Sequence, residues 1–421
     1  MTVTSSGRAA AAAGFVDPVR WPDIAVVPAS PIRAAIAKRL FRHAVRRLPL
    51  RVIEPAAWYG GGTGTDPVMR LVRPEPFFHR LGDSGTIGFG EAYMAGDWTT
   101  DDPPAVLSAF AAELRDLIPS MLQRLRHAVL RRQPREHDNT IEGARENIHQ
   151  HYDLSNDLFR LFLDETMTYS SAIFEGEPSG SSESLADAQR RKIDRLLDAA
   201  GVQKGSRVLE IGTGWGELAL RAAGRGATVT TLTLSSEQAA LADSRIAAAG
   251  LTDRVTVLQQ DYRETQGRFD AVVSVEMIEA VGANHWDEYF TSIDRVLAPG
   301  GRVGLQAILQ DDHTVGLTKD TYTWIRKYIF PGGQIPSVAA IARSLAARTS
   351  LKIADQYSFG RHYAETLHRW RVTFEERSSQ VEALGFDETF RRMWSLYLAY
   401  SEAGFRTGYL DVAQFTLTKP A

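Results

Sequence analysis

Two glutamates three positions apart interrupt an otherwise apolar stretch of the chain. The segment FDAVVSVEMIEAVG, residues 269–282, is largely apolar up to Val275 and then places Glu276 and Glu279 among apolar residues. A buried, unpaired carboxylate is costly, so charges in such surroundings are usually paired, exposed at the end of an element, or used in chemistry. The elements that surround the segment must decide among these three explanations.

A glycine-rich loop directly follows another predicted apolar strand. In VLEIGTGWGELAL, Gly212, Gly214 and Gly216 stand between the strand and a predicted helix. Glycines at this place let a ligand approach the backbone at the end of the first strand of an open sheet, although they can also serve tight packing alone. The loop by itself does not identify the ligand.

The residues around this loop favour S-adenosylmethionine over a dinucleotide. The third glycine comes one residue too early for the dinucleotide pattern, and the next predicted strand ends in TLTLSSEQ, without an acidic residue to bind a ribose. In a methyltransferase, we expect Glu210 near the sulfonium end of the cofactor, and Asp261 and Tyr262 of QQDYRE beside its adenine. An oxidoreductase that uses NAD is the alternative.

Strands and helices alternate along the second half of the chain. The predicted strands are SRVLEIGTGW, ATVTTLTLS, VTVLQQD, FDAVVSVEM and GRVGLQAIL. This alternation predicts an α/β fold with a doubly wound, mostly parallel sheet covered by helices on both faces. The strand that carries Glu276 and Glu279 would be the fourth, so its end would lie where open sheets bind their ligands.

The first third of the chain has a different character. Residues 1–30 are predicted to form a loose tail, and residues 31–137 a smaller α+β domain that precedes the main domain at 138–421. Helical spacing is expected after Ser30, whereas FFHRLGDSGTIGFGEAYMAGDW is expected to form short strands and glycine turns.

Two basic segments mark this smaller domain. In the first, SPIRAAIAKRLFRHAVRRLPLRVIEP, no acidic residue occurs between Asp23 and Glu54, and the second is RLRHAVLRRQPREHDNT. Such segments form either solvated helix faces or contacts with an anionic surface such as phospholipid headgroups. Both interpretations remain open.

Composition excludes several classes of protein. The 421 residues are 44% hydrophobic and carry a formal net charge of -3, so nothing in the overall charge favours nucleic acid as a partner. The absence of cysteine excludes disulfides, thiolate nucleophiles and cysteine metal sites, and no metal site is predicted. No apolar run approaches a membrane span, so we expect a cytoplasmic protein without a cleaved signal.

Six motifs together resemble the cyclopropane fatty acid synthase family over residues 146–418. They are NIHQHYDLSNDLFRLFLDETMTYSSAIFE, VLEIGTGWGELAL, TLTLSSEQ, QQDYRE, FDAVVSVEMIEAVG and WIRKYIFPGGQIPS, and GFGEAYMAGDWTTDDPPAVLSAF resembles the smaller domain of members that act on phospholipids. The resemblance implies a seven-stranded methyltransferase sheet and methyl transfer from S-adenosylmethionine to a cis double bond of a phospholipid acyl chain. It also implies a homodimer associated peripherally with the inner face of the membrane.

The resemblance implies a set of cofactor-binding residues, and the reaction implies aromatic residues. An alkene is a poor nucleophile, so the methyl group must be held in line with it and the resulting cation shielded from water by ring faces. The candidate aromatic residues, for which ordinary core packing is the alternative, are Tyr169, Phe174, Tyr322, Trp324, Tyr328 and Phe330. The cofactor residues implied are Tyr169, Ser170, Glu210, Gly212, Gly214, Gly216, Thr233, Gln238, Asp261 and Tyr262.

The resemblance further implies bicarbonate as the base that removes a proton. Its carboxylate partner falls on Glu279 and its tyrosine partner on Tyr363, and Ile308 is kept. Ser171 stands where the family has a cysteine, and Gln306 stands where it has a histidine. Both can donate hydrogen bonds, but the position and basicity of a bound bicarbonate would change. Glu276 is expected to be a support that orients the cofactor end or a neighbouring loop, and Ala280 stands where the family has a further histidine.

These replacements resemble the actinobacterial branch that makes branched acyl chains. We therefore expect methylation of an oleoyl phospholipid at C10 and a 10-methylene product, which a separate reductase would convert to the 10-methyl, tuberculostearic type of acid. Cyclopropanation is the first alternative, a small-molecule methyltransferase the second, and a non-catalytic lipid-binding protein the third.

Overall fold

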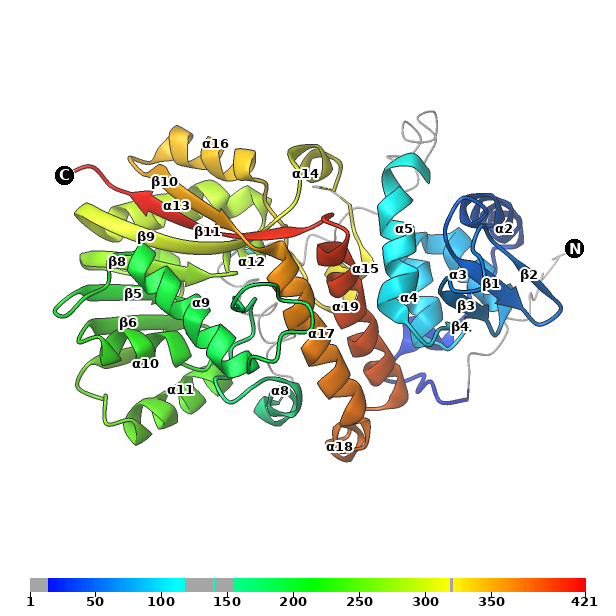
Figure 1. Cartoon of the computed structure of the whole chain (residues 1–421), viewed down its shortest axis with the longest axis horizontal. Helices are drawn as coiled ribbons and strands as arrows, with labels where there is room; N and C mark the ends of the chain where they lie inside the picture. Colours follow the sequence, from blue (N-terminus) through cyan, green and yellow to red (C-terminus); the bar gives the residue numbers. More distant parts are fainter. Residues whose placement is uncertain (1–13, 118–138, 141–154, 319–320) are drawn as a thin grey trace, which may run out of the picture. The chain divides into compact units, whose positions relative to one another are not determined.

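A computed structural model describes residues 14–117, 139–140, 155–318 and 321–421 (Figure 1). The chain divides into two compact units. The first comprises Met1–Arg132, Thr321–Ile329 and Phe374–Thr407, and the second comprises Gln133–Asp320, Phe330–Thr373 and Gly408–Ala421. The predicted division after residue 137 lies near the first boundary, but it does not include the two later segments that also belong to the first unit.

The first unit combines a small mixed sheet with helices. The sheet has the order β2-β1-β3-β4, in which β1 pairs antiparallel with β2 and parallel with β3, and β3 pairs antiparallel with β4. Helix α19 packs on α4 and α5, and this packing brings a C-terminal segment into the N-terminal unit. The elements are α1 (Pro22–Ala25), α2 (Pro31–Val45), β1 (Arg51–Glu54), β2 (Ala57–Tyr59), β3 (Val68–Leu71), α3 (Pro74–Ser84), α4 (Thr86–Met94), β4 (Trp98–Thr99), α5 (Pro103–Leu117), α15 (Trp324–Tyr328), α18 (Ser378–Ala383) and α19 (Glu388–Arg406).

The prediction of short strands and glycine turns in FFHRLGDSGTIGFGEAYMAGDW is wrong. Helices α3 and α4 occupy most of this segment, and only its last residue, Trp98, is in a strand. Gly85, with a φ of 59°, separates the two helices, and a side-chain carbon at Gly88 would lie 1.9 Å from the carbonyl oxygen of Arg80. Gly85 therefore forms a junction between two helices, and Gly88 allows close helix packing. Glycine is suited to both situations as well as to turns.

The second unit is built on a seven-stranded sheet with the order β10-β11-β9-β8-β5-β6-β7 (Figure 1). Strands β5 to β9 pair in parallel, whereas β11 runs antiparallel to both β9 and β10. The sheet confirms the predicted α/β fold class with a mostly parallel sheet. The strands are β5 (Arg207–Ile211), β6 (Thr228–Thr233), β7 (Val255–Gln259), β8 (Phe269–Val275), β9 (Leu297–Leu309), β10 (Lys352–Ser358) and β11 (Asp411–Thr418).

Helices cover both faces of this sheet, as predicted. Helices α9, α10 and α11 bury their apolar residues on one face, and α13 and α16 bury theirs on the other. The remaining helices include α8, which precedes the sheet in the chain, and α17, which runs from the second unit into the first. The helices are α8 (Asn156–Phe162), α9 (Leu185–Ala199), α10 (Glu217–Gly224), α11 (Ser236–Ala248), η2 (Tyr262–Glu264), α12 (Ile278–Val281), η3 (Ala283–His285), α13 (Trp286–Val296), α14 (Asp312–Thr318), α16 (Val338–Arg348) and α17 (Gly360–Glu376).

Within the described part of the chain, no helix combines the length and the apolar character that a membrane crossing requires.

Candidate active site

The three glycines after β5 have different surroundings. A side-chain carbon at Gly212 would lie 2.7 Å from the Met277 side chain, and one at Gly216 would lie 3.2 Å from Ala242. At Gly214 no described atom lies within 4 Å of that position, and its φ is 51°. Gly212 and Gly216 therefore permit packing, whereas Gly214 leaves an open face for a ligand.

Glu210 is the penultimate residue of β5, directly before this glycine loop. The residue is 3% exposed, and its Oε2 has no hydrogen-bond partner among the described residues. Burial raises the pKa of Glu210 to about 8. A buried carboxyl oxygen without a partner favours a cationic ligand, whose charge would lower this pKa again. Glu210 and Gly214 therefore fit S-adenosylmethionine, which carries a sulfonium and an ammonium group.

The residues predicted near the rest of the cofactor lie after β6 and β7. Thr233 donates its hydroxyl to Gln238 Oε1 at 2.9 Å, and Asp261 binds the Arg263 guanidinium through both carboxyl oxygens at 2.8 Å. The hydroxyl of Tyr262 has no partner among the described residues, and burial raises its pKa. Of these four predicted residues, Tyr262 has an unused polar atom for a ligand.

Tyr169 lies in a group of aromatic rings that the second unit forms by itself. Its ring centroid is 5.2 Å from that of Phe159, 5.3 Å from that of Trp370 and 6.2 Å from that of Phe162. Two residues earlier, Met167 has a φ of 55°, a left-handed conformation that is unfavourable for a residue with a side chain. The loop before Tyr169 is therefore held in a strained shape.

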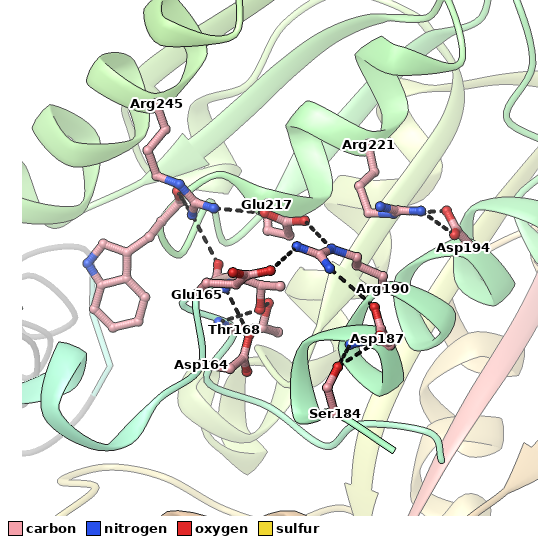
Figure 2. A network of polar contacts seen from close by, with 12 residues as sticks. Asp164, Glu165, Thr168, Ser184, Asp187, Arg190, Asp194, Glu217, Arg221 and Arg245 are labelled. Carbon is pink, nitrogen blue, oxygen red and sulfur yellow. Dashed lines mark hydrogen bonds and ion pairs between the residues drawn. The ribbon is translucent and has the colours of Figure 1, made fainter. Parts of the chain in front are cut away.

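A network of ion pairs holds this loop (Figure 2). Arg245 of α11 donates to the carbonyl oxygens of Thr166 at 3.0 Å and Trp215 at 2.7 Å, and it pairs with Glu217 at 2.7 Å. Arg190 of α9 pairs with Glu165 at 2.5 Å. Three helices thus position the residues that precede Tyr169. The cavity of about 340 Å³ beside them is lined by residues outside the predicted site, namely Arg160, Leu163, Asp164, Glu165, Met167, Leu241 and Arg245.

Glu276 is the centre of the polar contacts between β8 and its neighbours. Its Oε1 accepts hydrogen bonds from the Ser171 backbone N–H at 3.0 Å and from Gln306 Nε2 at 2.8 Å. Its Oε2 accepts from the Tyr363 hydroxyl at 2.7 Å. Glu276 is partly exposed and has a φ of 54°, so a strained residue directs its carboxylate at three donors.

Glu279 lies one turn further along, in α12. Its Oε1 accepts the backbone N–H of Ile308, and its Oε2 has no partner among the described residues. Burial, followed by the charge of Glu276, raises the pKa of Glu279 to about 8. The two carboxylates of the opening segment therefore belong to one site and influence each other.

The grouping of the predicted catalytic residues differs from the expectation. Ser171, Gln306 and Tyr363 converge on Glu276 instead of Glu279, and Ile308 alone of the predicted set binds Glu279. Glu276, which was expected only to support the site, lies at its centre. The resemblance assigned this role to Glu279 from its position in the motif. A motif position does not show which residues the side chain contacts in the folded chain. The chemical roles of these residues remain predictions.

Four further residues of this region have no signal in the predicted motifs. Gln414 of β11 lies opposite Gln306 of β9 and donates Nε2 to its Oε1 at 3.0 Å. Arg195 of α9 donates to Gln414 Oε1 at 2.8 Å. Lys192 of the same helix is fully buried and binds Ser170 Oγ at 2.6 Å, and burial lowers its pKa to about 8. Gln189, also buried, donates to the Ser170 carbonyl oxygen at 2.8 Å.

The other predicted aromatic residues divide between the two units. Tyr322, Trp324 and Tyr328 belong to the first unit, where Trp324 Nε1 contacts Met94 Sδ at 3.3 Å and the Tyr328 hydroxyl donates to Glu91 at 2.8 Å. Phe174 and Phe330 belong to the second unit. Core packing thus accounts for Trp324 and Tyr328, and a role of these five rings in shielding a cation remains a prediction.

The residues predicted to hold bicarbonate do not fit it as arranged. An anion needs donors, but those of Ser171 N–H, Gln306, Tyr363 and Ile308 N–H are directed at two carboxylates of the chain. The Ser171 hydroxyl donates to the carbonyl oxygen of Ala172 at 3.0 Å. A second anion at this place would also be repelled by Glu276.

The fold, the open glycine loop and the buried carboxylates define a methyltransferase that uses S-adenosylmethionine. The chain belongs to the family described as mycolic acid cyclopropane synthetase, whose model matches residues 139–415. It is 50% identical, over all of its length and 99% of the relative, to the tuberculostearic acid methyltransferase UfaA1 of Mycobacterium tuberculosis. It is 34% identical to the cyclopropane-fatty-acyl-phospholipid synthase of Escherichia coli, over 85% of this chain and 89% of that relative.

Solved structures agree with this family. The cyclopropane synthase MmaA2 from Mycobacterium tuberculosis has a TM-score of 0.60 and 34% identity, over 65% of this chain and 98% of that one. The mycolic acid cyclopropane synthase CmaA1, complexed with SAH and CTAB, has a TM-score of 0.60 and 31% identity, over 68% and 99%. The comparisons confirm the predicted family, the fold class and the dependence on S-adenosylmethionine.

Proposed function

We propose that the chain transfers the methyl group of S-adenosylmethionine to the cis double bond of an unsaturated acyl chain, preferably oleoyl, in a membrane phospholipid. The observation that carries the proposal is the 50% identity over the whole chain with a relative named as a tuberculostearic acid methyltransferase. The rings of Phe159, Phe162 and Trp370 around Tyr169 support it, because ring faces stabilise a cation and exclude water.

The proposed product is a 10-methylene acyl chain. After methyl transfer, the positive charge lies on the neighbouring carbon, and a 1,2-hydride shift moves it to the carbon that bears the new methyl group. Loss of a methyl proton then gives an exocyclic methylene, and this proposal needs no bicarbonate. A separate reductase would saturate the product.

Cyclopropanation is the second candidate. It is favoured by the 34% identity with the phospholipid cyclopropane synthase of Escherichia coli. Both reactions share the methyl transfer and differ in which cation loses the proton.

Helix α2 is the proposed contact with the inner face of the cytoplasmic membrane. Ile32, Ile36 and Leu40 are spaced four residues apart and are 77%, 56% and 49% exposed. Arg39 and Arg33 are exposed on the same helix, and no acidic residue lies between Asp23 and Glu54. An apolar stripe flanked by cations suits an anionic bilayer.

The second basic segment, Arg124–Arg135, lies outside the described residues. We further propose that the chain acts as a homodimer.

The test is a reaction of the purified chain with S-adenosylmethionine and vesicles of dioleoylphosphatidylglycerol, followed by gas chromatography and mass spectrometry of the fatty acid methyl esters. The expected product has one additional carbon and an exocyclic methylene. A cyclopropane as the main product would establish the second candidate instead.

Soluble amines and alcohols serve as the comparison substrates in the same assay. Faster release of S-adenosylhomocysteine from them than from the vesicles would make the chain a small-molecule methyltransferase and overturn the proposal.

A further inference from the structure

Glu276 has a geometry that a purely structural residue does not need. Its φ of 54° is unfavourable for a residue with a side chain, and such conformations persist mainly where the surrounding structure requires them for function. Its backbone N–H donates to the Gln306 carbonyl oxygen at 2.8 Å, which fixes this conformation at the end of β8. The residue is partly exposed, so it is not enclosed in the core.

The neighbouring groups require Oε1 of Glu276 to be an acceptor. The Lys192 carbonyl oxygen can only accept and the Arg195 guanidinium can only donate, so Gln414, which contacts both, has one possible orientation. Gln414 therefore donates to Gln306 Oε1, and the Gln306 amide group must turn its Nε2 to Glu276. This chain of contacts favours the ionised form of Glu276.

The two oxygens of Glu276 are not equivalent. Among the described residues, Oε1 accepts two hydrogen bonds, from Ser171 N–H and Gln306, whereas Oε2 accepts one, from Tyr363. A carboxylate oxygen has two lone-pair sites, so Oε2 keeps one for a further proton.

We propose that Glu276 is the base that removes the proton from the methylated acyl cation, so that the chain carries its own base in place of an exchangeable bicarbonate ion. This inference rests on the proposed function. In the step, a C–H bond of the new methyl group breaks and its electron pair becomes the second bond of the exocyclic methylene. The proton moves to Glu276 Oε2, and the positive charge of the acyl chain is removed. Water later takes the proton when the product has left.

The charged groups around Glu276 agree with this role. Lys192 of α9 attracts its negative charge, whereas Glu279 of α12 repels it, and Tyr363 of α17 and Gln306 of β9 donate to it. Burial is the largest influence and raises the pKa of Glu276 above the ordinary glutamate value. A carboxylate with a raised pKa is a stronger base than one in water.

The test compares Glu276→Gln with the wild-type chain on dioleoylphosphatidylglycerol vesicles. The matched control is Glu376→Gln, which makes the same change at an exposed glutamate at the end of α17. We expect Glu276→Gln to lose about 100-fold or more in turnover, the usual effect of removing a general base, while the affinity for S-adenosylmethionine stays within about threefold. The control and the wild-type chain in bicarbonate-free buffer should keep their full rate.

Glu276→Asp covers the case in which Glu276→Gln does not fold, because it keeps the carboxylate but moves it back by one carbon. With S-adenosylmethionine that carries a trideuterated methyl group, Glu276→Asp should form less methylene product than with the ordinary cofactor, since a C–D bond must break at a misplaced base. A variant with the rate and isotope effect of the wild type overturns the inference.

Two other results also overturn it. One is turnover of Glu276→Gln within tenfold of an active wild type. The other is a wild-type rate that falls more than tenfold without bicarbonate and recovers when it is added. If the wild-type chain itself does not methylate the vesicles, the proposed function fails, and the inference fails with it.

Discussion

Gln306 and Gln414 lie opposite each other on the antiparallel strands β9 and β11, and Gln414 Nε2 is 3.0 Å from Gln306 Oε1. This pair links the carboxylate of Glu276 to Arg195, whose guanidinium lies 4.0 Å above the ring of Tyr357. Gln414 touches no proposed reactant, but it determines that the Gln306 amide turns its nitrogen towards Glu276.

Replacing Gln414 by Leu should therefore change the titration of the site. The variant leaves the Gln306 amide free to turn, so Glu276 loses a donor that stabilises its charge, and its pKa rises. We expect about tenfold slower turnover, the usual order for the loss of one hydrogen bond to a charged group, with unchanged cofactor affinity. The acid limb of the pH–rate profile should move to higher pH. An unmoved limb would leave Gln414 with a structural role only.

The conformation of Glu276 predicts an order of stability among its variants. Glu276→Gly and Glu276→Ala both remove the carboxylate, but only glycine adopts a φ near 54° without strain. The glycine variant should be more stable than the alanine variant by about 1 kcal/mol in the free energy of unfolding, measured with urea. Both should be inactive. Equal stabilities would contradict the strain at this position.

The raised pKa of Glu279 predicts that the difference in stability between the wild type and Glu279→Gln depends on pH. Its folded-state pKa of about 8 lies above the ordinary value of 4.5, so the folded chain holds a proton that the unfolded chain has lost between these values. Stability is therefore lost as pH rises through this range. Glu279→Gln has no group that titrates at this position. The melting temperature of the variant, relative to that of the wild type, should therefore rise from about pH 5 to about pH 8. Below pH 4.5 the difference should be constant.

Membrane binding should depend on the exposed cations of the first basic segment. Charge reversal at Arg39, Arg46 and Arg47 should weaken binding to anionic vesicles by roughly 100-fold at low salt, because each cation contributes about 1 kcal/mol. Cofactor affinity should not change. Vesicle sedimentation measures the first and calorimetry the second.

The control for this prediction reverses three exposed cations of the second unit, Lys204, Arg254 and Lys352, with the same change in net charge. Binding that weakens equally in both variants would indicate a general effect of charge. Arg42 is left unchanged because it pairs with Glu54 at 3.0 Å and contributes to the fold.

Much of the second unit could be predicted from sequence because its signals are local. The glycine loop, the apolar strands and their alternation with helices specify the sheet before any contact is known. The partners of Glu276 could not be predicted in this way, since Ser171, Gln306 and Tyr363 come from three distant parts of the chain. Gln414 and Arg195 carry no motif at all: the register of β11 on β9 reveals Gln414, and the contact of α9 with Gln414 reveals Arg195. In the first unit, glycines that pack two helices together looked like turns.

The membership of α19 in the first unit has a consequence for synthesis. Residues 374–407 complete that unit, and α19 packs on α4 and α5, which leave the ribosome much earlier. At about 5–20 residues per second, the intervening chain takes on the order of tens of seconds to emerge. During this time α5 lacks its partner helix α19. The N-terminal unit therefore cannot be completed until almost the whole sequence has been translated.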